Sequence, residues 1–112
     1  MVTAELAVSL PALLLAGLLA VTGVQIASAQ LRCLDAAGIA ARLAARGELH
    51  ADVDASAKAA APRDAEVALS RDGEVVSAVV AAPVHLLGLG RVLPAFRVSA
   101  SAAEPTEPGQ AH

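Results

Sequence analysis

The residue with the greatest chemical potential in this sequence is Glu5, a single carboxylate at the head of a long apolar segment. No charged side chain follows it until Arg32. An ionisable group beside a membrane-length segment is costly in lipid, so it is a functional candidate by default. The alternative is structural, because an acidic residue in the first turn of a helix interacts favourably with the helix dipole.

The other chemically capable residues are not arranged as a site. His50, His85 and His112 lie far apart, without a second ligand at the spacing that metal centres need. The Gly-Leu-Gly of residues 88–90 lacks the third glycine of a dinucleotide-binding loop, and no elbow motif frames a nucleophile. We therefore expect no catalytic residue, no cofactor and no metal, and a protein that is not an enzyme.

The chain has one cysteine, Cys33, which excludes a disulfide within the chain. Free cysteine is among the most buried residue types, so we expect a small packed side chain here. Pairing with a cysteine of another chain is the alternative.

The uncharged residues 6–31 form the strongest pattern in the sequence. As a helix they would extend for roughly 39 Å, and a bilayer core needs only about 20 residues. Pro11 would leave the carbonyl of Ala7 without a partner, which membrane helices tolerate. The segment is therefore expected to be a transmembrane helix.

Two other interpretations of this segment stay open. Ala27-Ser28-Ala29 fits a signal peptidase site, which would release a secreted binding module after Ala29, although no basic residue precedes the segment. The second is an orphan single-pass membrane protein. Arg32, Arg42 and Arg46 follow the segment, which weakly favours a cytoplasmic C-terminal part.

Composition limits what the rest of the chain can form. Its 112 residues leave room for one small domain, alanine is abundant, and Phe96 is the single aromatic residue. Such a core is expected to be thin and to depend on neighbouring molecules. The net charge of −3 gives no basic patch, so nucleic acid is not an expected partner.

Residues 31–47 continue the helical pattern, and Gly47 is a plausible end of the helix. At about 100° per residue, Gly38, Ala41 and Ala45 lie on one broad face. Small residues allow membrane helices to approach closely, so these three are candidate packing residues. The alternative is that alanine is there only because it is the best helix former.

The second half of the sequence changes period. Residues 48–64 are expected to form a linker with a short helix, which Asp52 or Asp54 would cap and Pro62 would end. Residues 65–70 and 74–82 are rich in valine and flank an Asp-Gly, which predicts a hairpin.

In that hairpin, Arg71 and Glu74 are expected to face each other across the turn. Residues 95–102 alternate, with Phe96, Val98 and Ala100 on one face, and predict a third strand. The Pro- and Glu-rich residues 103–112 are expected to be a disordered tail.

These elements predict an α+β protein with a long N-terminal transmembrane helix followed by a small three-stranded antiparallel sheet. The expected boundaries are 1–47 for the transmembrane and extended helix, 48–64 for the linker, 65–102 for the β domain and 103–112 for the tail.

The stretch VTAELAVSLPA, ahead of an uninterrupted apolar helix, a charged Ala-rich helix, a hairpin and a final strand, resembles the TadE-like minor pilins (pseudopilins). These belong to the tight-adherence (Flp, type IVb) pilus system, and the resemblance is to their short actinobacterial kind. It covers roughly residues 1–105. Gly38 departs from the pattern, since many members have an arginine near that position.

The resemblance implies a function and a site. A basic leader ending in glycine would precede Met1, and a membrane-embedded aspartyl prepilin peptidase would cut there on the cytoplasmic side. Glu5 would then be the fifth mature residue, paired with the α-amino group of an adjacent subunit. The implied partners are the membrane, other pilins and the pilus assembly platform, with the sheet domain outside the cytoplasm.

Overall fold

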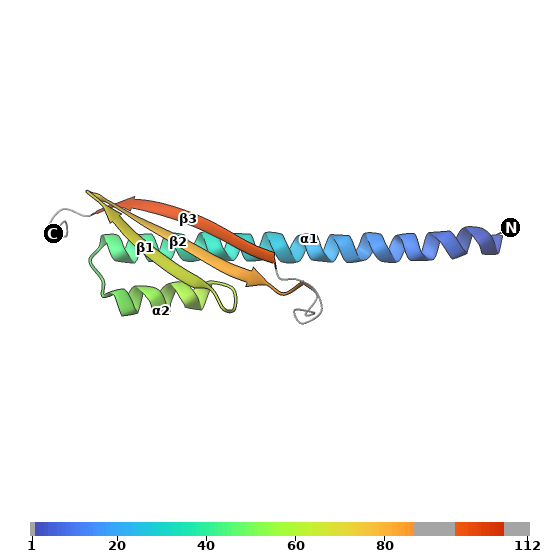
Figure 1. Ribbon diagram of the computed structural model, residues 1–112, viewed down its shortest axis with the longest axis horizontal. Helices are drawn as coiled ribbons and strands as arrows, with labels where there is room; N and C mark the ends of the chain where they lie inside the picture. Colours follow the sequence, from blue (N-terminus) through green and yellow to red (C-terminus); the bar gives the residue numbers. More distant parts are fainter. Residues whose placement is uncertain (1, 87–95, 107–112) are drawn as a thin grey trace.

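The structure, a computed structural model, describes residues 2–86 and 96–106. Its elements are α1 (Val2–Ala45), α2 (His50–Ala60), β1 (Glu66–Asp72), β2 (Val75–Val84) and β3 (Phe96–Pro105). The α+β class, the long N-terminal helix and the three-stranded antiparallel sheet are confirmed. Figure 1 shows α2 and the sheet gathered along one half of α1, while its N-terminal half stands free.

Helix α1 runs without interruption through Pro11 and ends where its last carbonyls find substitute donors. The amide of Gly47 donates to the carbonyl of Ala44 at 3.1 Å, and that of Glu48 donates to Leu43 at 3.1 Å. Gly47 has a φ of 82°, so this is a Schellman ending with glycine at the left-handed position. The predicted end of the helix at Gly47 is confirmed.

Helix α2 begins at His50, before the predicted capping residues Asp52 and Asp54. Its N-cap is Leu49, which makes no side-chain cap hydrogen bond, and Asp52 lies inside the first turn. Capping by Asp52 or Asp54 is therefore wrong, because the helix already begins at His50 and both aspartates lie inside it. Asp54 instead forms an ion pair with Lys58 at 3.1 Å, one turn along the same helix.

The sheet has the order β1-β2-β3, and both pairs are antiparallel. The hairpin has a two-residue turn, Gly73-Glu74, between the paired residues Asp72 and Val75. Gly73 has a φ of 63°, while no positive φ occurs at Glu74, which is the pattern of a type II′ turn. Arg71 is consequently opposite Val76, and the predicted pairing of Arg71 with Glu74 across the turn is wrong.

Strand β3 alternates as predicted over most of its length, with Val98 buried and Ala100 half-buried. Phe96 departs from that prediction, because its side chain is 55% exposed although it shares the face of Val98. The strand continues to Pro105, so the prediction that the disordered tail begins at residue 103 is wrong for residues 103–105, which pair with β2. The amide of Thr106 donates to the carbonyl of Glu74 beside the hairpin turn.

The core lies between the second half of α1, α2 and the inner face of the sheet. Its largest fully buried side chains are Val53, Val76, Val80 and Cys33, so the core is thin, as the composition predicted. Small side chains let the backbones approach closely, and this proximity replaces the bulk of aromatic residues. We call residues 22–45 of α1, together with α2 and the sheet, the head.

Candidate functional site

Glu5 lies in the first turn of α1, at the free end of the molecule. Its side chain is exposed, and no ion pair joins it to another residue of the described ranges. The head begins about five turns away along the helix. Among residues 2–86 and 96–106, no cationic side chain therefore supplies a counter-charge for Glu5. Met1, the predicted processing position, lies outside the described residues.

The free half of α1 is apolar and uncovered. Residues 2–21 are all exposed, and an 18-residue window of this helix is apolar enough to cross a membrane with none of it buried. Leucine and valine supply most of that surface: Leu6, Val8, Leu10, Leu13, Leu14, Leu15, Leu18, Leu19 and Val21. A helix of this length and composition suits a membrane span or a signal sequence.

The alternative cleavage point lies inside the folded head. Ala29 is a helical residue that is only 8% exposed, and Ile26 packs against the same core. The side-chain amide of Gln30 donates to the carbonyl of Ser99 at 2.7 Å. Cleavage after Ala29 would therefore remove core residues and separate α1 at its contact with β3.

The predicted packing residues have different surroundings. Ala41 and Ala45 are 0% and 4% exposed within the core, so this chain's own elements cover them. Gly38 is only partly buried, and a Cβ there would lie 3.4 Å from the guanidinium of Arg42. The structure thus places two of the three residues in packing within the chain.

The sequence contained a signal for this internal face. The buried residues of α1 recur at helical spacing: Ala29, Cys33, Ala36, Ala37, Ala40, Ala41, Ala44 and Ala45. That spacing is typical of a helix that is buried along one face. Alanine is only weakly hydrophobic and is abundant throughout this helix, so the buried face does not stand out in the sequence. Cys33 is 0% exposed and free, as expected for a packed side chain.

A polar contact at the far end of the head was not predicted. The guanidinium of Arg71 lies 3.5 Å from the carbonyl of Ala44 and 3.4 Å from the hydroxyl of Thr106. It therefore joins the end of α1, the hairpin and the end of β3. Sequence spacing gives no sign of this contact, because the partners are 27 and 35 residues away.

No group of three or more metal-ligating side chains occurs in the described part of the chain, and no polar or charged residue is buried there. The features that remain are surfaces: the free apolar helix with its acid, and the exposed faces of the head. Together they define a class of small α+β protein in which a packed head is carried on a long, half-uncovered apolar helix (Figure 1).

The chain is 43% identical over 105 residues to "Apoptosis inhibitor Rv3655c" of Mycobacterium tuberculosis (strain ATCC 25618 / H37Rv), a match that covers 94% of this chain and 78% of the relative. The chain belongs to the same family as Rv3655c. No protein-family model and no solved structure matches it.

Proposed function

We propose that this protein is a TadE-like minor pilin that is anchored in the membrane by the first half of α1 and takes part in assembling a tight-adherence pilus or a related secretion apparatus. The role is structural and not enzymatic. One observation carries the proposal: the exposed apolar half of α1 bears a single acid near its end, which has no ion-pair partner in the part of the chain that the structure describes, and the head covers the helix only from Thr22 onward.

The proposed role of Glu5 follows from its position. A carboxylate at the edge of lipid is poorly solvated, and an unpaired charge in such a setting is strongly unfavourable. The α-amino group at residue 1 of an adjacent subunit is a suitable counter-charge once a prepilin peptidase has exposed it. Pairing of the two groups sets the axial register in which neighbouring helices pack.

The proposed location is the cell membrane, with a single pass and with the head outside the cytoplasm. The head is built from a hairpin and a long strand around a thin core, without an internal disulfide. The arginines that follow the apolar segment favour the opposite orientation, so topology is a sharp test of the pilin role.

Substitution of Glu5 tests the proposal directly. Glu5→Ala and Glu5→Gln should both insert in the membrane, because each makes the helix less polar. Both should lose co-purification with pilin or platform partners and should reduce piliation in cells that carry the tight-adherence genes. Glu48→Gln is the matched control, since Glu48 is an exposed acid at the other end of α1. Normal assembly with both Glu5 variants would leave Glu5 as an ordinary first-turn acid.

The name of the relative supports a second candidate, inhibition of apoptosis. The identity of 43% over nearly the whole chain is the observation that favours it. The test is to add the full chain to cultured animal cells that have been treated with an apoptosis inducer and to measure caspase activity. Unchanged caspase activity, where Rv3655c lowers it under the same conditions, would reject this candidate.

A further inference from the structure

The end of the head nearest the free half of α1 contains an open groove of about 560 Å³. It lies between α1, the segment that joins α2 to β1, and the end of β2. Its lining includes Val24, Gln25, Ser28 and Arg32 of α1, with Arg63 and His85 from the other two segments.

The groove lies at the level where the proposed anchor leaves the bilayer. A helix that enters the hydrocarbon near Leu6 crosses about 30 Å of it in about 20 residues, which ends the crossing near Gln25. Arg32 follows about two turns later. The groove therefore opens at the depth of the lipid headgroups, with its arginines on the water side.

Near the groove, the ion pairs between described residues involve His85 and Arg97 but not Arg32 or Arg63. Nε2 of His85 lies 3.8 Å from the carboxylate of Asp64, and the guanidinium of Arg97 lies 3.7 Å from Glu66.

By contrast, neither Arg32 nor Arg63 forms an ion pair with a residue that the structure describes. Asp35 lies on the adjacent surface of α1 but is not within ion-pair distance of Arg32. Two guanidinium groups without an ion-pair partner among residues 2–86 and 96–106 thus line one groove.

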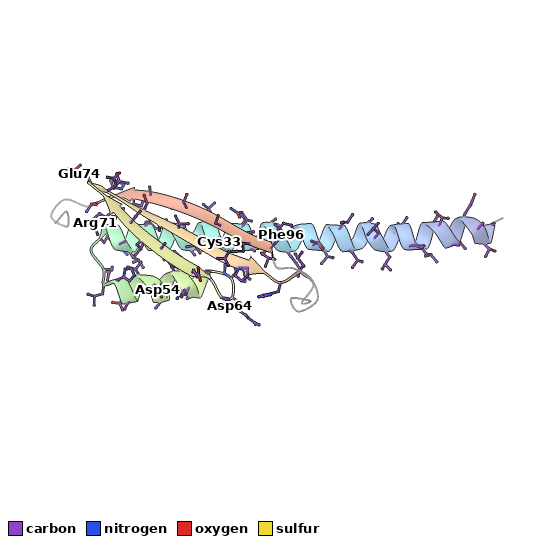
Figure 2. The ribbon with its side chains drawn as sticks, in the orientation of Figure 1. Cys33, Asp54, Asp64, Arg71, Glu74 and Phe96 are labelled. Carbon is purple, nitrogen blue, oxygen red and sulfur yellow. The ribbon has the colours of Figure 1, made fainter. Side chains whose placement is uncertain are left out.

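The single aromatic residue of the chain is at the same end of the head. Phe96 begins β3 opposite Val84, the last residue of β2, and its side chain is 55% exposed. Figure 2 shows Phe96 and Asp64 at the end of the head that adjoins the free half of α1, whereas Arg71 and Glu74 lie at the opposite end. An exposed aromatic at the water–lipid boundary is typical of residues that contact the interface.

We infer that this end of the head docks on the membrane surface and that the groove binds the phosphate of an anionic phospholipid headgroup between Arg32 and Arg63, with Phe96 inserted beside it. Guanidinium groups suit this ligand because their planar donors match phosphate oxygens. The inference rests on the membrane anchoring in the proposed function. Docking would fix the tilt of the head relative to the bilayer, and so the direction in which the sheet faces neighbouring subunits.

A tryptophan reporter can test the docking because the chain has no tryptophan of its own. The full chain with Phe96→Trp is reconstituted into vesicles of phosphatidylcholine, alone or mixed with phosphatidylglycerol. We expect the emission to shift to shorter wavelength and brominated lipid to quench it as the anionic fraction rises. Val75→Trp is the matched control, since Val75 is 41% exposed at the other end of β2 and should not respond.

Charge substitution then tests the groove. In the Phe96→Trp background, Arg32→Gln with Arg63→Gln should weaken docking on anionic vesicles about fivefold per arginine. Arg46→Gln, at the far end of α1, is the control and should leave docking unchanged.

Equal tryptophan signals in neutral and anionic vesicles, or docking that the double substitution leaves unchanged, would overturn the inference. Flotation separates this failure from a failure of the anchor. If the chain floats with both kinds of vesicle but its tryptophan emission neither shifts nor is quenched, the docking is rejected and the anchor is retained. If the chain floats with neither kind of vesicle, both the membrane anchor and the docking are rejected.

Discussion

The side-chain amide of Gln30 donates a hydrogen bond to the backbone carbonyl of Ser99, with 2.7 Å between nitrogen and oxygen. These residues are 69 positions apart, and the bond joins the middle of α1 to the edge strand β3. Within the head, it holds β3 against α1 near the point where the helix becomes uncovered.

Gln30→Glu should loosen this contact, because the carboxylate keeps the length of the side chain but cannot donate to the carbonyl of Ser99. We expect the free energy of opening of β3 to fall by about 1 kcal/mol. Hydrogen exchange of the β3 amides in detergent micelles measures this opening. Leu34→Ala, an exposed change one turn further along α1, should leave the exchange as it is. Equal exchange in wild type and Gln30→Glu would show that the bond contributes nothing.

Ala41→Leu tests whether the small-residue face packs inside the chain. Ala41 is fully buried, so added volume should overpack the core and cost about 1–3 kcal/mol. Gly38→Ala on the same helix should be neutral or stabilising by up to about 1 kcal/mol, because only the flexible end of Arg42 has to give way. The stability of the two variants can be compared by measuring how much urea is needed before the head becomes sensitive to a protease. A head that tolerates Ala41→Leu but no longer assembles would favour packing between subunits.

Cys33 should react slowly with a maleimide in the folded protein and rapidly once urea unfolds the head, because its side chain is 0% exposed. Leu34→Cys in a Cys33→Ser background is the control, since Leu34 is 50% exposed on the same helix and should be labelled at once. A disulfide-linked dimer of the native protein on a non-reducing gel would contradict the buried position and support the alternative of pairing between chains.

Much of the fold could be predicted from the sequence because its strongest signals are local. The uncharged run of residues 6–31 predicts a long helix, and Gly47 marks the end of α1. The Asp-Gly between two valine-rich runs predicts the hairpin. Each of these signals comes from one continuous stretch of the sequence, where local preferences act without help from distant parts of the chain.

The predictions that were wrong concern side-chain positions. These positions depend on contacts between distant parts of the chain or on the exact register of the hairpin. Gly73 takes the first place of the turn, which moves Arg71 away from Glu74 and frees its guanidinium to reach Ala44 and Thr106. The alternation of β3 predicts that Phe96 faces inward, yet it lies at the open end of the sheet where little covers it. The shared groove of Arg32 and Arg63 is likewise a property of the folded head, because the two residues are 31 positions apart in the sequence.

A reporter fused after residue 112 should be active outside the cytoplasm if the protein has the orientation of a pilin. Alkaline phosphatase is a suitable reporter, because it is active only after export, and a fluorescent protein that matures only in the cytoplasm gives the complementary signal. Activity confined to the cytoplasm would show that Arg32, Arg42 and Arg46 control the topology. The proposed docking surface would then face the inner leaflet.

The N-terminus of the mature protein distinguishes the anchored pilin from the released module. We expect mass spectrometry of the membrane-extracted protein to show a chain that starts at or beside Met1. A chain that starts at Gln30 would have lost Ala29 and Ile26 from its core, together with the whole uncovered half of α1. Such a chain should also open β3 more readily, because Gln30 would become a frayed terminal residue and could no longer hold the carbonyl of Ser99 firmly. Detection of that chain in the culture medium, folded and resistant to protease, would reject the anchor and favour the secreted binding module. Its absence from the medium, with a full-length chain in the membrane fraction, is the result that the structure of the head leads us to expect.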